Sequence, residues 1–71
     1  MRYTMVIEKG PTSYGAYVPD LPGCVAAAGT EQEVRQLIRE AISFHLEAMR
    51  EEGLEIPEAL STAEFVDVAV A

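Results

Sequence analysis

The chain has 71 residues, of which 49% are hydrophobic, and a formal net charge of −7 at pH 7. A chain of this length forms one domain, residues 1–71, and buries only about 60% of its unfolded surface, so a single core is marginal. One cysteine and one histidine exclude an intramolecular disulfide and a structural zinc site with four Cys/His ligands. Self-association is the remaining aid to stability, and we expect a homo-oligomer, either a dimer or a tetramer.

Charge and hydropathy limit where the protein acts and what it binds. The N-terminus alternates polar and apolar residues instead of showing a signal peptide, and no run approaches the roughly 18 apolar residues of a membrane span. We therefore expect a cytoplasmic protein, with which a free thiol agrees. Residues 1–30 are balanced in charge, whereas residues 31–71 hold the whole net charge. This field repels nucleic acid and attracts a basic partner.

Three short segments in the first half are predicted to be strands. Residues 2–9 alternate between apolar and polar side chains with the period of two that is typical of a strand. A Gly-Pro-Thr turn separates them from the aromatic segment 13–18, so the two segments are expected to form an antiparallel hairpin. The short apolar segment 24–28 is predicted to be the third strand.

The helix is predicted over residues 31–52. Thr30 and Glu33 have the spacing of a capping box. Gly53 suits the left-handed position after the helix, where a Schellman motif forms, and Pro57 prevents the helix from resuming. At 100° per residue, one apolar stripe contains Val34, Leu37, Ile38, Ala41, Ile42, His45, Ala48 and Met49.

Phe44 and Leu46 lie at opposite rims of this stripe and widen it beyond what one sheet face requires, which is a second indication of a subunit contact. After a linker, the alternating segment 64–71 is predicted to be a last strand. The order strand, strand, strand, helix, strand predicts an α+β domain with one helix on one face of a small sheet. A right-handed crossover would place the last strand beside the first and parallel to it, in the order 3-2-1-4.

Few side chains have the arrangement that catalysis requires. Cys24 is either a nucleophile, with His45 as its one possible histidine partner, or a small apolar residue that starts a strand, which we favour. His45 on an apolar stripe is more often a hydrogen-bonded core residue than a general base. Glu8 and Asp67 on neighbouring strands could approach each other, but two carboxylates are a weak metal site. We therefore expect no enzyme, no cofactor and no metal.

The stretch YGAYVPDLPGC, residues 14–24, holds two prolines that bracket Asp20 and Leu21. Pro22 at the second position of a type II turn would place Gly23 at the third, where φ is positive. This turn chemistry predicts a stiff corner that displays Asp20 and Leu21. A rigid corner loses little entropy on binding, which suits recognition by a partner, although a plain turn between strands would carry the same residues.

Residues 14–58 resemble the N-terminal domain of the HicB antitoxin family. The shared features are the sequence Y-x-A-x-x-P-D-L-P-G-C, a short strand, a T-x-x-E capped helix carrying H-L-E, and G-L-x-I-P. The resemblance implies a degenerate ribonuclease-H-like α+β domain without nuclease activity. It also implies a small basic toxin ribonuclease, HicA, as partner, whose active site the domain masks. By similarity, the partner-binding positions would be Tyr17, Pro19, Asp20, Leu21, Pro22 and Gly23.

Family members carry a DNA-binding module after the last strand, whereas this chain ends at Ala71 without a basic segment, so operator binding is not expected. The leading hypothesis is a non-enzymatic module that masks a HicA-like toxin. The alternatives are a self-associating oligomeric module with another client and a vestigial nuclease that depends on Glu8 and Asp67.

Overall fold

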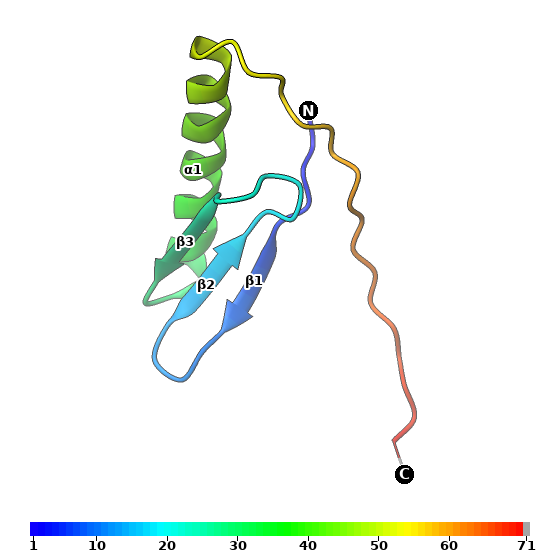
Figure 1. Cartoon of the computed structure of the whole chain (residues 1–71). Coiled ribbons are helices and arrows are strands. Elements are labelled where there is room, and N and C mark those ends of the chain that lie inside the picture. The colour runs from blue at the N-terminus through cyan, green and yellow to red at the C-terminus, as the bar shows by residue number, and fades with distance from the viewer. Residues whose placement is uncertain (71) are drawn as a thin grey trace.

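The computed structural model describes residues 1–70 and shows three strands followed by one helix (Figure 1). The elements are β1 (Val6–Lys9), β2 (Tyr14–Tyr17), β3 (Val25–Ala28) and α1 (Glu31–Glu51). The strands form an antiparallel sheet in the order β1-β2-β3. The predicted α+β class is thus confirmed, with β1 shorter than the predicted segment 2–9. The likeness to ribonuclease H stays a prediction.

The register of the sheet separates two faces. Ile7 pairs with Ala16, and Ala16 pairs with Ala26, which places one row of small and apolar side chains toward α1. Tyr17 pairs with Val6 on one side and with Val25 on the other, which places a second row on the opposite face. In the β1–β2 turn, the backbone N–H of Gly10 donates to the Ser13 carbonyl at 2.7 Å.

The core lies between the first half of α1 and one face of the sheet. Val34 and Ile38 of α1 are completely buried, at the spacing of four residues that places two side chains on one side of a helix. The buried hydrophobic side chains are Ala16, Val18, Leu21, Cys24, Val34 and Ile38. This core is small, as the surface-to-volume ratio of a chain of 71 residues requires.

Both ends of α1 follow the sequence signals. Thr30 is extended at φ −131°, and its hydroxyl accepts from the Glu33 backbone N–H at 3.1 Å. The Glu33 carboxylate accepts from that hydroxyl rather than from the Thr30 backbone. At the other end Gly53 has φ 73°, and the Leu54 N–H donates to the Met49 carbonyl at 2.8 Å. Together with the bond from the Gly53 N–H to the Arg50 carbonyl at 3.1 Å, this bond completes the Schellman motif that the sequence predicts.

The helix is longer than the sheet that it covers. Its 21 residues span about 31 Å, whereas a strand of four residues spans about 13 Å. Figure 1 shows the C-terminal half of α1 extending beyond the strands. The predicted stripe is also wider than the sheet, because Leu37 is 42% exposed and Phe44 is 76% exposed. Leu37, which the sequence places on this stripe, is therefore only partly covered.

The predicted last strand is not formed in the described residues. Residues 64–70 adopt no strand, and the predicted end of that strand, Ala71, lies outside the described residues. A strand needs a neighbour that takes its backbone N–H and C=O groups, and the segment after Ser61 leaves the sheet before it can pair with β1 (Figure 1). The order 3-2-1-4 is therefore corrected to three strands. Over residues 1–70, no helix combines the length and hydropathy that a bilayer crossing requires.

Candidate binding surface

The loop between β2 and β3, residues 18–24, is built from two consecutive β-turns. The Leu21 N–H donates to the Val18 carbonyl at 3.0 Å, and the Cys24 N–H donates to the Leu21 carbonyl at 3.1 Å. The Val18 N–H closes the loop on the Cys24 carbonyl at 3.3 Å. Gly23 has φ 86°, as the third position of a type II turn requires. The loop therefore holds its shape through its own backbone.

Leu21 lies in the core instead of on the surface. Its side chain is 1% exposed and belongs to the buried cluster with Val34 and Ile38. Leu21 is the residue that the two turns share, so the chain reverses on both sides of it and the side chain packs beneath the loop. The expectation that the corner displays Leu21 is wrong. Its role is to fasten the loop to the hydrophobic core.

Asp20, which was also expected to be displayed, binds a distant part of the chain. The Ser61 backbone N–H donates to Oδ2 of Asp20 at 2.8 Å, and the Ser61 hydroxyl donates to Oδ1 at 2.9 Å. Hydrogen bonds favour the charged form of a carboxyl group. The bond from the Ser61 backbone therefore holds the pKa of Asp20 below its ordinary value, although partial desolvation acts in the opposite direction.

Two further hydrogen bonds hold the same segment, and no sequence pattern indicates them. The Thr4 hydroxyl donates to the Ser61 carbonyl at 2.8 Å, and the Tyr3 hydroxyl donates to the Pro57 carbonyl. Together with Asp20, these side chains fasten residues 57–61 across the start of the chain. The partners lie more than 40 residues apart in sequence, so no local pattern could have shown them.

Exposed residues occur both in the loop and on the sheet face that α1 does not cover. Pro19, Pro22 and Gly23 are exposed, and Tyr17 is 39% exposed. Directly opposite Tyr17 lies Val25, which is 65% exposed. Tyr17 and Val25 thus form an apolar pair on the sheet face that α1 does not cover. We define Tyr17, Pro19, Pro22, Gly23 and Val25 as the open face.

Val25 was not among the sequence-predicted site residues. Its exposure follows from the pairing register, which a strand of small apolar residues does not reveal. Asp20 lies half-buried at the edge of the open face and serves the chain's own structure through Ser61. Four of the six predicted residues are thus exposed, Asp20 is half-buried and Leu21 is buried.

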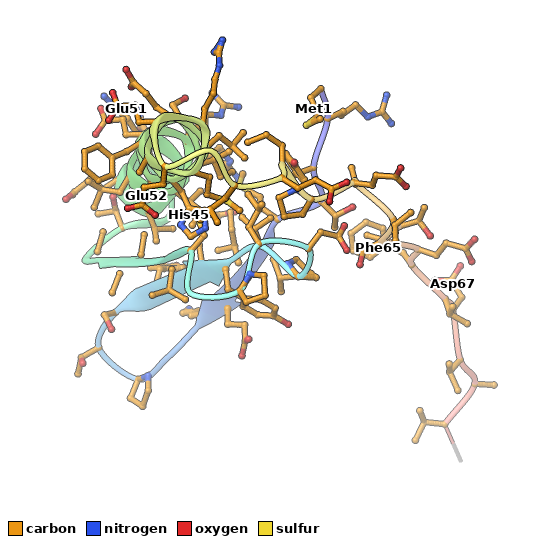
Figure 2. The ribbon with its side chains drawn as sticks, turned by 45° about the horizontal axis from the view of Figure 1, so that its top comes forward. Met1, His45, Glu51, Glu52, Phe65 and Asp67 are labelled. Atoms are coloured by element: carbon orange, nitrogen blue, oxygen red, sulfur yellow. The ribbon has the colours of Figure 1, made fainter. Side chains whose placement is uncertain are left out.

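The candidate chemical groups occupy separate places. Cys24 is 3% exposed, and burial raises the pKa of its thiol, which lowers the thiolate fraction that a nucleophile needs. His45 is half-buried on the side of α1 that faces the sheet layer (Figure 2). Asp67 lies in the extended C-terminal segment instead of on a strand beside Glu8 (Figure 2). Within residues 1–70, no three His, Cys, Asp or Glu residues gather as a metal site.

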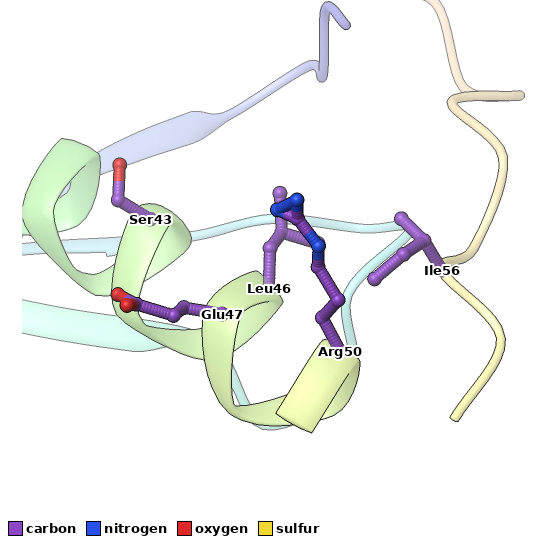
Figure 3. Close-up of a pocket in the computed structure, with 5 residues that line it drawn as sticks. All are labelled: Ser43, Leu46, Glu47, Arg50 and Ile56. Carbon is purple, nitrogen blue, oxygen red and sulfur yellow. The ribbon is translucent and has the colours of Figure 1, made fainter. Parts of the chain in front are cut away.

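A groove lies beneath the part of α1 that extends beyond the strands. It has a volume of about 450 Å³, and Figure 3 shows its lining of Ser43, Leu46, Glu47, Arg50 and Ile56. The lining mixes two aliphatic side chains with one acid and one base. The groove is formed where the segment after the helix turns back beside it, away from the open face.

These features define a small α+β domain that covers one sheet face with its helix and leaves the other open beside a stiff loop. The sequence signature of the HicB_like antitoxin of bacterial toxin-antitoxin system matches residues 3–69. The chain belongs to this family.

Relatives occur in phages, archaea and bacteria. The chain is 39% identical over 67 residues to an uncharacterized 14.9 kDa protein in the rep-hol intergenic region of Haemophilus phage HP1, covering 94% of this chain and 50% of that protein. The chain thus spans half the length of this relative. It is 36% identical over 58 residues to a UPF0150 protein of Thermoplasma acidophilum, covering 80% of this chain and 84% of that protein. No solved structure is significantly similar to the chain.

Proposed function

We propose that the chain is a non-enzymatic antitoxin module that binds a small basic toxin of the HicA type and masks its active site. The observation that carries this proposal is the family match over residues 3–69. Binding would take place in the cytoplasm, where the free thiol of Cys24 stays reduced.

The open face supports the proposal through its rigidity and composition. Aromatic side chains in apolar surroundings are frequent anchors of protein interfaces, and Tyr17 beside Val25 has this character. The loop that carries Pro19 and Pro22 is closed by three backbone hydrogen bonds and fastened by Leu21. Such a surface loses little conformational entropy when a partner binds.

Charge supports a basic partner. From Glu51 onward the chain has six acidic residues and no basic residue, and the acidic side chains in this part are exposed. Oppositely charged surfaces accelerate association, and the effect weakens as salt is added. The toxin's positive surface would therefore meet the acidic end of the chain, while the open face supplies the short-range contacts.

The test co-expresses the chain with the product of an adjacent small basic reading frame and measures growth together with recovery of the complex. We expect relief of toxicity and a complex whose affinity falls with salt. The antitoxin role is lost if neither relief nor binding is observed.

Variants then locate the contact. Tyr17→Ala should weaken toxin binding by about 30-fold or more, because anchor residues of an interface contribute at least about 2 kcal/mol. Gln36→Ala, at an exposed position of α1, is the matched control and should bind as the native chain does. Circular dichroism of both variants verifies folding. Equal binding by the two variants would place the interface elsewhere.

A further inference from the structure

The C-terminal segment, residues 62–70, has the composition of a strand but no partner. We call it the tail. Phe65 is fully exposed, and Val66, Val68 and Val70 are each more than 70% exposed. In an extended chain the three valines lie on one face, because side chains alternate. β-Branched residues at this spacing fit a half-buried pleated surface, and water is an unfavourable environment for them.

The sheet has an unoccupied edge of matching size. The order β1-β2-β3 leaves one side of β1 without a strand among the described residues. The backbone N–H and C=O groups on such an edge are a template for another strand. On this edge Ile7 belongs to the row that faces α1. An added strand with Val66, Val68 and Val70 on the same side would extend that apolar row under the helix.

The tail does not approach the β1 edge of its own chain. Ser61 is held by Asp20 and by Thr4, and beyond it both Figure 1 and Figure 2 show the chain leaving the sheet. A hollow of about 490 Å³ lies beside this anchor, lined by residues 2–4 and by residues in the range 59–63. The chain therefore contains a strand-like tail and a free edge of β1 that do not meet each other.

We propose that the tail of one chain adds as a strand to the β1 edge of a second copy, and that the second copy's tail returns the contact. In a dimer with two-fold symmetry, each tail pairs with the β1 edge of the other chain, so no tail and no β1 edge is left without a partner. Nine extended residues reach up to about 30 Å, more than twice the length of β1. The tail carries Glu64 and Asp67, whereas β1 contains Glu8 and Lys9 and is preceded by Arg2, so the two segments have net charges of opposite sign.

The first experiment measures the mass of the full chain by sedimentation equilibrium. The native chain should be a dimer, or a tetramer built from such dimers. Val68→Pro removes a backbone donor from the middle of the tail and should weaken association by roughly tenfold or more. Val68→Thr keeps a β-branched residue of the same shape and should retain the native mass. Val68 is 73% exposed, so neither variant should unfold the monomer.

The second experiment identifies the chain that the tail contacts. In a Cys24→Ala background, chains carrying Glu8→Cys are mixed with chains carrying Asp67→Cys and treated with a short bismaleimide. We expect a covalent product with one chain of each kind, whereas Gln36→Cys in place of Glu8→Cys should give little. The double variant Glu8→Cys, Asp67→Cys should give linked pairs of chains.

Three results would overturn this proposal. The first is a single-chain mass for the native protein at every concentration that its solubility permits. The second is an unchanged mass for Val68→Pro, which would shift the contact to the exposed Leu37 and Phe44 side of α1. The third is a link confined to one chain in the double variant, which would mean that the tail folds onto its own β1.

Discussion

The loop at residues 18–24 and the segment after the helix, residues 54–70, both lack regular structure and both contain proline, yet they are held in different ways. Backbone bonds between residues no more than six apart close the loop. Side chains from the first 20 residues hold the second segment at Pro57 and Ser61 through hydrogen bonds. Beyond Ser61, residues 62–70 form no regular structure and are exposed. The difference shows that irregular backbone becomes rigid by local closure or by distant anchors, and only local closure can be read from nearby residues.

The largest expected difference comes from the same substitution, leucine to alanine, made once in each of the two regions. Leu21→Ala should lower the free energy of unfolding by about 2 to 5 kcal/mol, because it removes a leucine side chain that is 1% exposed. Leu60→Ala, in the second segment, should change stability by less than about 0.5 kcal/mol, because Leu60 is 76% exposed. Urea denaturation measures both. Similar losses would contradict the assignment of Leu21 as the loop's fastening to the core.

Backbone conformation in the loop gives the next largest effect. Gly23→Ala should destabilise the protein by about 1 kcal/mol, because φ is 86° and an alanine is strained in this conformation. The added Cβ meets no atom within 4 Å, so a steric clash does not contribute. Strain of the turn is then the whole cause. At Gly29 the space is equally open but φ is not positive, so Gly29→Ala should be neutral or slightly stabilising. Thermal unfolding of the two variants measures the contrast.

Anchoring of the second segment should have a local effect. Asp20→Asn removes the charge that accepts both bonds from Ser61, so hydrogen exchange at the Ser61 amide and proteolysis near it should become faster. Exchange within β2 and α1 should change much less. Glu55→Gln, at an exposed site of the same segment, is the control and should leave both rates as they are. Unchanged exchange in Asp20→Asn would mean that Asp20 does not hold the segment.

The smallest effect is a dependence of this anchoring on pH. The pKa of Asp20 is lowered in the folded chain by its bond from the Ser61 backbone, so the unfolded or released form binds the proton more readily. The stabilisation is fully present above about pH 4, the ordinary range of an aspartate, and is lost as the pH falls through the lower folded value. NMR of the Ser61 amide should show release on acidification. Asp20→Asn should abolish this pH dependence.

Local chemistry made most of the fold predictable. The N-cap at Thr30, the Schellman motif at Gly53 and the positive φ of Gly23 each depend on a few consecutive residues, and all three are found in the structure, although the Glu33 carboxylate accepts from the Thr30 hydroxyl and the full capping box does not form. The alternation of residues 64–70 carries the same kind of local signal, yet no strand forms. An alternating sequence indicates that a segment can form a strand, whereas actual pairing also requires a free sheet edge close to that segment.

The candidate site was less predictable than the fold. Pro22 and Gly23 correctly indicated a turn with positive φ at Gly23. The direction of each side chain depends on how the turns are placed over the helix, so the burial of Leu21 could not be read from the sequence. The exposure of Val25 follows from register and from the uncovered face of the sheet. The partnership of Asp20 with Ser61 spans 41 residues, a separation over which residue order contains no geometric information.

The length difference between α1 and the strands divides the helix into two zones of unequal local stability. Its first half rests on the sheet through Val34 and Ile38, whereas its last turns are flanked by the groove beside Ile56. The last turns contain half-buried side chains such as Leu46 and Met49 but no buried one. Because helical turns with little tertiary packing are marginal in water, α1 should unwind from Glu51 backward on heating before the sheet-bound half melts. The chain is then expected to pass through partly unwound forms that keep the strands and the loop intact.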